Sequence, residues 1–522
     1  MSKKMLKSGA IVSAMTFISR ILGLIRDIVV ANIMGAGAAA DVFLFANKIP
    51  NFLRRLFAEG AFAQAFVPVF SEYQEKHSQD EVRRLIAAVS GTLGTIVTVI
   101  TLIGVIASPV IVALFGFGWF LDWLNDGPSS SKYELASSLL KITFPYLWFI
   151  TFVAMAGAIL NTLGKFAVAA FTPVFLNIAI IACAVWLSPY VDRAEYVLAF
   201  GVFLGGCIQF LFQIPFLKRA GVLVRPTWNW HHPGVVKIRT LMIPAMFGVS
   251  VSQINLLLDT LIASFLQTGS ISWLYFSDRL LEFPLGLFGI AIATVILPSL
   301  SKLHVNESPQ HFSKTLDWGV RLVCLLGVPA MFGLILLAKP MLTVLFMRGE
   351  FTSYDVEMAS ISLMAYGAGL LSFMLVKVLA PGYYARQDTK TPVRFGIFAM
   401  ACNMLFNIIF AIPYGYVGLA IATSMSASLN AFLLWRGLKQ QQVFELRTST
   451  VWFLGRLLIA VACMAVFLWQ FTPPLSSWVS FNLWQQITWL AGLIGVGALI
   501  YLLVNLILGL RINDLRVSGA DN

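Results

Sequence analysis

The sequence predicts an all-α polytopic membrane protein with about 14 transmembrane helices. Of its 522 residues, 59% are hydrophobic and only 11% are charged, whereas the charged share of soluble domains is about 25%. The mean hydropathy is +0.83. Runs of about 20 mainly apolar residues are long enough to cross the hydrocarbon core of a bilayer, and they account for most of the chain.

Fourteen such runs follow one another along the sequence. The expected spans are 10–33, 41–69, 86–115, 134–162, 166–187, 196–217, 238–266, 271–299, 318–343, 355–383, 392–413, 416–437, 450–472 and 482–509. The first run follows MSKKMLK and lacks a small-residue cleavage site, so we expect a retained helix and no signal peptide. The five cysteines fall inside these runs without paired spacing, which predicts neither a disulfide nor a metal site.

The basic residues support this span count. With the N-terminus in the cytoplasm, 23 of the 36 Lys and Arg residues fall in cytoplasmic loops and tails, and the opposite loops hold only Lys132, Arg193 and Arg348. Cytoplasmic loops of membrane proteins carry an excess of basic residues. An even number of spans with both termini inside is therefore predicted, and the net charge of +12 is no sign of nucleic-acid binding.

An internal repeat divides the chain. A shift of 230 residues places 47–71 over 277–301 and aligns Pro68 with Pro298, and the TPV at 172–174 recurs at 391–393. We therefore expect two six-helix lobes related by a pseudo-two-fold axis along the membrane normal. The predicted domains are an N-terminal lobe at 1–217, a cytoplasmic linker at 218–237, a C-terminal lobe at 238–437 and two extra helices at 450–509.

The second span is unusually rich in charge. On a helix Asp41, Lys48 and Arg55 lie on one stripe, and Glu59 follows one turn after Arg55. A charged residue at the centre of a spanning helix costs about 2.5–3.5 kcal/mol. An amphipathic helix on the membrane surface is one interpretation. The loop charges require this segment to cross, which favours a water-filled polar cavity between helices.

Spans one and eight carry the other deep charges. Arginine presents a planar fork that donates two parallel hydrogen bonds to phosphate oxygens, so the pattern suits a diphosphate. A closed ion-pair network that locks the two halves together is the alternative, and the location at the repeat interface favours binding. The candidate binding residues are Arg20, Arg26, Lys48, Arg54, Arg55 and Arg279, and the accompanying carboxylates are Asp27, Asp41, Glu59, Asp278 and Glu282.

Several expected absences favour transport over catalysis. No GxxxxGK[ST] motif for nucleotide phosphates occurs, and all five histidines fall in cytoplasmic loops. We therefore expect no enzymatic activity and no cofactor. One exception is a candidate Na⁺ site with oxygen ligands from Asp259, Asn403, Asn407 and Thr423, although such residues in membrane helices also hydrogen-bond to neighbouring helices.

Several segments resemble the MurJ (MviN) family of bacterial lipid II flippases over essentially the whole chain. They are SRILGLIRD (19–27), NKIPNFLRRLFAEGAFAQAFVPV (47–69), SVSQI (250–254), SDRLLEFPLGLFG (277–289) and KVLAPGYYARQDTKTPV (377–393). The resemblance implies the fold of the multidrug/oligosaccharidyl-lipid/polysaccharide exporter superfamily, with two lobes around a central cavity and two C-terminal helices that form a groove for the polyprenyl tail.

The resemblance also implies a function and a location. The family's required cavity arginines fall on Arg20, Arg26, Arg54 and Arg279. We expect a monomer in the bacterial inner membrane that moves lipid II from the inner to the outer leaflet, driven by membrane potential or an ion gradient. Where some members carry an Asp ligand for Na⁺, this chain has Asn407. Export of another polyprenyl-diphosphate-linked glycan and a non-transporting role as a cell-wall scaffold are the alternatives.

Overall fold

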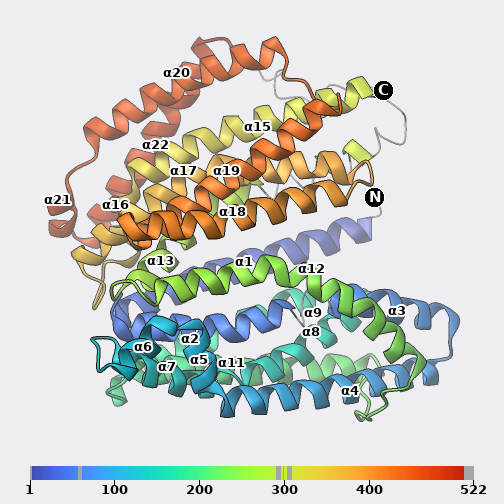
Figure 1. The fold of residues 1–522 in the computed structure, drawn as a ribbon. Coiled ribbons are helices and arrows are strands. Elements are labelled where there is room, and N and C mark those ends of the chain that lie inside the picture. Colours follow the sequence, from blue (N-terminus) through green and yellow to red (C-terminus); the bar gives the residue numbers. More distant parts are fainter. Residues whose placement is uncertain (1–2, 57–61, 290–295, 298, 302–308, 511–522) are drawn as a thin grey trace. The chain divides into compact units, whose positions relative to one another are not determined.

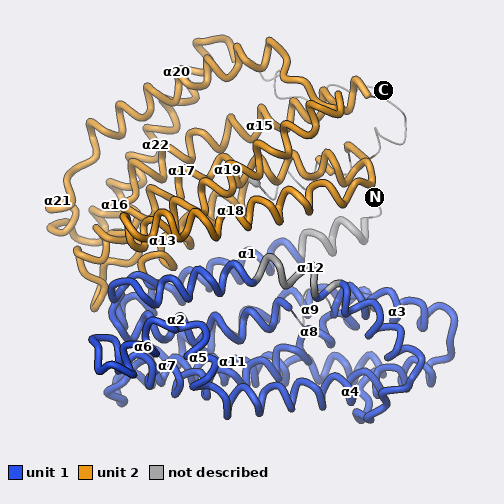
Figure 2. Tube along the Cα trace, viewed as in Figure 1, with its two compact units in different colours: residues 1–272 blue, residues 273–522 orange. Residues whose placement is uncertain are grey.

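The computed structural model is helical throughout the residues that it describes, which are 3–56, 62–289, 296–297, 299–301 and 309–510. These residues form an all-α membrane protein, as the composition predicts. The chain divides into two compact units, residues 1–272 and 273–522 (Figure 2). The predicted lobe boundaries at 217 and 238 rest on the sequence repeat and stay a prediction.

Unit 1 consists of the helices from α1 to α12 (Figure 1). Its helices are α1 (Lys3–Met34), α2 (Ala38–Leu53), α3 (Phe62–Lys76), α4 (Gln79–Ile106), α5 (Ser108–Phe115), α6 (Phe117–Leu124), α7 (Ser130–Thr143), α8 (Tyr146–Thr162), α9 (Phe166–Phe171), α10 (Pro173–Trp186), α11 (Ala194–Arg219) and α12 (Pro233–Ala263). Helix α10 packs between α1 and α11, α2 packs on α7, and α12 packs on α3.

Unit 2 begins within α13 (Ser270–Pro284), which passes at Pro284 into a π-helical turn, Leu285–Gly289. The helices that follow are α15 (Pro309–Leu336), α16 (Ala338–Phe346), α17 (Ser353–Tyr384), α18 (Lys390–Tyr414), α19 (Tyr416–Gln440), α20 (Thr448–Phe471), α21 (Leu475–Ser480) and α22 (Leu483–Ile507). Helix α19 packs between α17 and α18, and α20 packs on α15 and α22.

Ten helices in the described residues are long and apolar enough to cross a membrane. Prolines divide three of the predicted spans: Pro109 follows the break between α4 and α5, Pro145 precedes α8, and Pro173 begins α10. Proline lacks the N–H that continues a helix, yet it is well tolerated in the first turn of the next one. The protein is therefore a multi-pass membrane protein, and the count of 14 stays a prediction.

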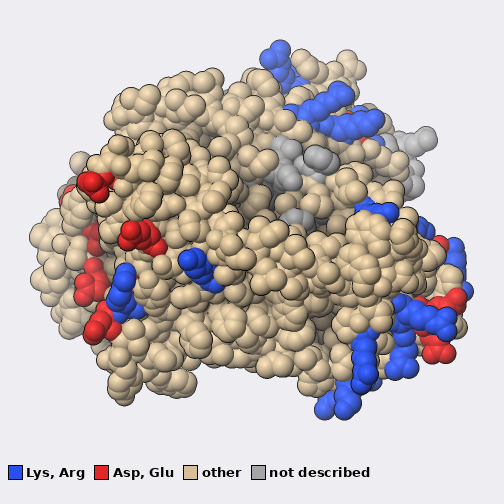
Figure 3. All heavy atoms as spheres, turned by 60° about the horizontal axis from the view of Figure 1, so that its bottom comes forward, with Lys and Arg blue, Asp and Glu red and all other residues tan. Residues whose placement is uncertain are grey.

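Charged side chains are sorted by position on the surface. On the face drawn in Figure 3, Lys and Arg side chains gather at the right of the view, over the end of unit 1 that holds the α3–α4 connection, and most of the acidic side chains lie at the left. The centre of that face is uncharged. This separation is typical of a protein whose middle lies in lipid and whose charged ends meet water.

Candidate functional site

Arg26 is held in place from two helices of unit 1. Its Nε and Nη2 donate to Asp27 Oδ1 at 3.0 and 2.7 Å, and its Nη1 donates to Asn177 Oδ1 at 3.1 Å. Asn177 Nδ2 in turn donates to the backbone carbonyl of Ser19 at 3.2 Å. The Arg26 side chain is 15% exposed and that of Asp27 is 3% exposed. The guanidinium therefore has a fixed direction and retains a small accessible surface.

Arg20 and Asp27 do not share an environment, although the heptad spacing places them on one stripe. Arg20 is exposed, whereas Asp27 is buried against Arg26. Arg55 is also exposed, and Arg54 is half-buried with its Nε donating to Asn51 Oδ1 at 3.2 Å. Glu59 lies outside the described residues.

Asp41 lies in a buried polar cluster that the stripe did not predict. Its carboxylate accepts hydrogen bonds from the Gly269 N–H at 2.7 Å, the Ser272 N–H at 2.9 Å and the Ser272 hydroxyl at 2.7 Å. The Lys132 ammonium lies 3.8 Å away and above the Trp119 ring. Both charged side chains are almost fully buried. Asp41 therefore binds the beginning of α13, with Lys132 as its counter-ion.

Lys48 contacts a helix distant in sequence. Its ammonium donates to Thr260 Oγ1 on α12 at 3.3 Å. Thr260 is fully buried and its hydroxyl also donates to the Leu256 carbonyl. The three residues of the predicted stripe therefore have different environments within unit 1. Asp41 is in a buried ion pair, Lys48 contacts a hydroxyl group, and Arg55 is exposed.

The charges of α13 pair as the sequence spacing predicts. Arg279 Nη1 donates to Glu282 Oε2 at 2.9 Å, one turn later. The guanidinium also lies over the Tyr275 ring, 5.4 Å from its centroid, and Nη2 reaches the Tyr275 hydroxyl at 3.4 Å. Glu282 and Asp278 are exposed and Arg279 is half-buried. The carboxylate and the ring orient the guanidinium and leave part of it accessible.

The candidate Na⁺ ligands lie in both units. Asn403 and Asn407 are buried one turn apart on α18, and the Asn403 Oδ1 accepts no hydrogen bond from the described residues. Thr423 donates to the Leu419 carbonyl of its own helix, and Asp259 is half-buried on α12 of unit 1. Amide oxygens suit a hard cation. Within the described part of the chain, no group of three or more His, Cys, Asp or Glu could hold a metal ion.

Four residues that contact predicted site residues were not predicted from the sequence. Asn177, Lys132, Thr260 and Ser272 each contact a predicted site residue. Asn, Thr and Ser are common in membrane helices, so their residue types carry no signal. The sequence predicts Lys132 in the loop before the span at 134–162, whereas in the structure it is buried in the first turn of α7.

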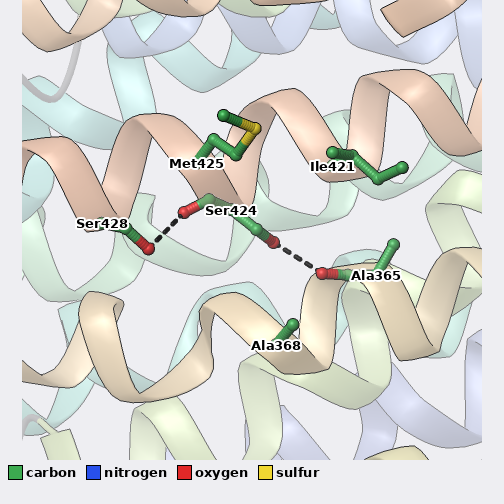
Figure 4. A pocket seen from close by; sticks show the side chains of 6 residues that line it. All are labelled: Ala365, Ala368, Ile421, Ser424, Met425 and Ser428. Atoms are coloured by element: carbon green, nitrogen blue, oxygen red, sulfur yellow. Dashed lines mark hydrogen bonds between the residues drawn. The ribbon is translucent and has the colours of Figure 1, made fainter.

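Unit 2 contains a groove lined mainly by apolar side chains. It lies between α17 and α19, encloses about 320 Å³ and is lined by Ala365, Ala368, Ile421, Ser424, Met425 and Ser428. Figure 4 shows Ser424 donating to the Ala365 carbonyl, so its hydroxyl is already engaged. No charged residue lines this groove, which sets it apart from the surroundings of the arginines.

A family model described as "Lipid II flippase MurJ" matches residues 30–489, which is most of the chain. The chain belongs to the MurJ family. A MurJ relative from Vibrio cholerae serotype O1, named a probable lipid II flippase, is 67% identical over 99% of this chain and 98% of its own length. A Haemophilus influenzae relative with the same name is 59% identical over 97% of this chain and 100% of its own.

Solved structures agree with the MurJ assignment. A structure of a lipid II flippase MurJ in an inward closed conformation is similar with a TM-score of 0.79 at 29% identity, covering 95% of this chain and 98% of that one. An inward-facing MATE family transporter of the MOP superfamily is similar with a TM-score of 0.66 at 13% identity, covering 83% of this chain and 98% of that one. The second likeness shows the shared fold alone.

Proposed function

We propose that this MurJ-family protein moves lipid II, an undecaprenyl-diphosphate-linked disaccharide-pentapeptide, from the inner to the outer leaflet of the cytoplasmic membrane by alternating access. The names of its close relatives support this substrate. In the proposal the protein makes no chemical change in the lipid, acts as a monomer and has both termini in the cytoplasm, in agreement with its loop charges.

The observation that carries the proposal is the orientation of Arg26 by Asp27 and Asn177. An arginine inside an apolar helix is costly unless it is paired, and such residues usually serve transport. Here one guanidinium edge is occupied by the Asp27 carboxylate. This ion pair lowers the free-energy cost of burying the Arg26 guanidinium. It also fixes the orientation of the N–H groups that would bind the diphosphate. Arg279, held by Glu282 and Tyr275, has the same construction in unit 2.

In the proposed cycle, Arg26 and Arg279 bind the diphosphate, and Arg20, Arg54, Lys48 and Arg55 add positive charge around it. Movement of one charge through 100 mV corresponds to about 2.3 kcal/mol. We propose that membrane potential or an ion gradient supplies this drive.

The test replaces each arginine in purified protein reconstituted into proteoliposomes with labelled lipid II. We expect Arg26→Ala and Arg279→Ala to lower translocation at least tenfold, because each removes a charge-assisted contact of about 1.5–3 kcal/mol. Arg394→Ala, at an exposed position on α18, is the matched control and should retain full activity. A normal rate in both site variants, with equal protein incorporation, would contradict the proposal.

A Na⁺ site at α18 is a further part of the proposal. Asn403 and Asn407 present two buried amide groups to one side of the helix, and the unengaged Asn403 oxygen is a suitable ligand. Thr423, also in unit 2, would add a hydroxyl oxygen, and the fourth predicted ligand, Asp259, belongs to unit 1 and stays a prediction. Bound Na⁺ would satisfy a buried acceptor that otherwise costs about 1–3 kcal/mol.

A further inference from the structure

Residues 222–232, which connect α11 to α12 and which we name the strap, have no regular secondary structure and contact the first half of α4. The Thr227 N–H donates to the Ala87 carbonyl at 2.9 Å, and the Asn229 N–H approaches Thr92 Oγ1 at 3.3 Å. A Cβ on Gly91 would lie 2.2 Å from the Thr227 carbonyl. The absence of a side chain at Gly91 therefore allows the strap to contact α4 directly.

The strap covers a face of α4 that is exposed farther along the helix. Thr98 and Leu102 are exposed, and they lie seven and eleven residues after Gly91 on the same face. Arg84 lies seven residues before Gly91 and is also exposed. Helix α4 is long and apolar enough to cross a membrane. If the exposed turns of this face meet the bilayer core, the strap lies at the level of the lipid headgroups.

An aromatic and basic cluster forms the outer surface of the strap. The rings of Trp228 and Trp230 are stacked with centroids 6.0 Å apart, and Trp228 is 57% exposed. The Arg239 guanidinium from α12 lies 4.2 Å from the Trp230 ring centroid. Tryptophan is enriched where membrane meets water, because its ring is apolar and its N–H is polar.

Arg239 has hydrogen-bonding capacity that the described residues do not use. The Arg239 side chain is partly exposed, and its buried Nη1 makes no hydrogen bond within the described part of the chain. Arg225 on the strap and Arg84 on α4 add two exposed positive charges. The nearby Lys237 ammonium is paired with Glu72 and therefore adds no further available positive charge. A guanidinium stacked on a ring and lacking an acceptor is suited to a phosphate oxygen.

We propose that the strap, Arg239 and Arg84 form a binding site for the headgroup phosphate of an anionic phospholipid in the cytoplasmic leaflet. Arg239 would bind the phosphate, Trp230 would hold the guanidinium flat, and Trp228 would lie among the acyl-chain carbonyls. The assignment to the cytoplasmic leaflet rests on the proposed orientation with both termini in the cytoplasm. The lipid site itself does not depend on the transport activity. Lipid bound here would seal the strap against α4 and fix the depth of unit 1 in the membrane.

The test is native mass spectrometry of the purified full-length protein titrated with phosphatidylglycerol. Arg239→Gln should weaken the tightest phosphatidylglycerol binding about fivefold, the effect of one arginine near an anionic surface. Trp230→Leu should weaken it as well. Arg447→Gln, which removes an exposed arginine at the start of α20, is the matched control and should leave that binding unchanged.

The alternatives give distinct results. Equal weakening by Arg239→Gln and Arg447→Gln would show general surface attraction and overturn the site. Binding of free glycerol phosphate as tight as that of the lipid would overturn the assignment to a membrane lipid. Hydrogen exchange of residues 222–232 in nanodiscs gives a second readout: phosphatidylglycerol should protect them more than phosphatidylcholine in the unsubstituted protein, and equal protection would contradict the proposal.

Discussion

At the scale of single residues, a charge buried in this protein is defined by the neighbours that hold it. Arg26 and Asp41 both belong to charged segments that stand out in the sequence, yet their environments differ. Arg26 keeps an accessible edge, whereas Asp41 is enclosed by Lys132, Ser272 and the Gly269 amide. Residue type and spacing predicted that both are deep. They could not show which one is available to a substrate, because that depends on residues more than 90 positions away in the sequence.

Asn177 offers a test of that distinction. Asn177→Ala removes the acceptor of Arg26 Nη1, so the guanidinium should lose its fixed direction and translocation should fall about tenfold, since hydrogen bonds to charged groups contribute about 1.5–3 kcal/mol. Asn177→Asp keeps an acceptor for Arg26 and should retain more activity. Proteoliposome translocation at equal protein content measures both. Equal loss in the two variants would assign Asn177 a role in packing α1 instead.

His232 predicts a pH dependence at the start of α12. Its Nδ1 accepts the Gly234 N–H at 3.1 Å as the N-cap, and burial lowers the pKa of the imidazole from 6.5. The neutral form is therefore favoured in the folded protein. The stabilisation is fully present above the unfolded pKa of 6.5 and is lost as pH falls through the lower folded value.

We expect the first turn of α12 to exchange its amide hydrogens faster at about pH 5 than at about pH 7.5, after correction for intrinsic rates, since a lost N-cap costs about 1 kcal/mol. Hydrogen exchange with mass spectrometry measures this. His232→Asn provides a cap that does not titrate and should remove the pH dependence. Persistence of the dependence in that variant would assign it to another group.

At the scale of elements, the sequence predicts where apolar segments lie better than where helices end. Predicted spans four and five coincide with α7–α8 and α9–α10, but each is divided at a proline. The second division is supported by Gln209 and Gln213, whose amides donate to the Thr172 carbonyl and hydroxyl. Hydropathy cannot detect such breaks, because the residues around them are as apolar as the rest of the span.

Gly91 tests the close contact between α4 and the strap. Gly91→Ala places a methyl group where the Thr227 backbone lies, so the strap should move and the protein should lose about 1–3 kcal/mol of stability, as in other overpacked sites. Thermal unfolding in detergent and hydrogen exchange of residues 222–232 measure the effect. Gly333→Ala is the control, since a Cβ there meets no atom within 4 Å. Equal stability of the two variants would contradict the close contact.

At the scale of the whole molecule, composition alone is enough to predict a polytopic membrane protein. The resemblance of the motifs is enough to predict the MurJ family. The family model and the relatives agree with both. The boundary between the two compact units does not follow from composition or motifs. The repeat suggests a boundary before α12, whereas α12 contacts α2, α3 and α4 of unit 1. Repeats record ancestry, and packing depends on which faces are apolar in the present chain.

The proposed Na⁺ site gives a prediction for the complete transport cycle. If Na⁺ binds the amide oxygens of α18, replacing Na⁺ by choline should lower lipid II translocation in proteoliposomes severalfold. Asn403→Ala should lower the rate in Na⁺ and abolish the response to replacement, because the oxygen that accepts no hydrogen bond from the described residues is gone. An unchanged rate in choline would exclude Na⁺ as the driving ion and leave membrane potential as the drive.

The contact between Asp41 and the start of α13 has a consequence for biogenesis. The ribosome makes Asp41 and Lys132 long before Gly269 and Ser272. Until α13 is inserted, the carboxylate has Lys132 as counter-ion but lacks its three hydrogen-bond donors, and a buried ion pair whose remaining hydrogen bonds are unmade is destabilising. The N-terminal unit can therefore reach its final packing only after residue 272 has entered the membrane. Its maturation is delayed until synthesis of the second unit has begun.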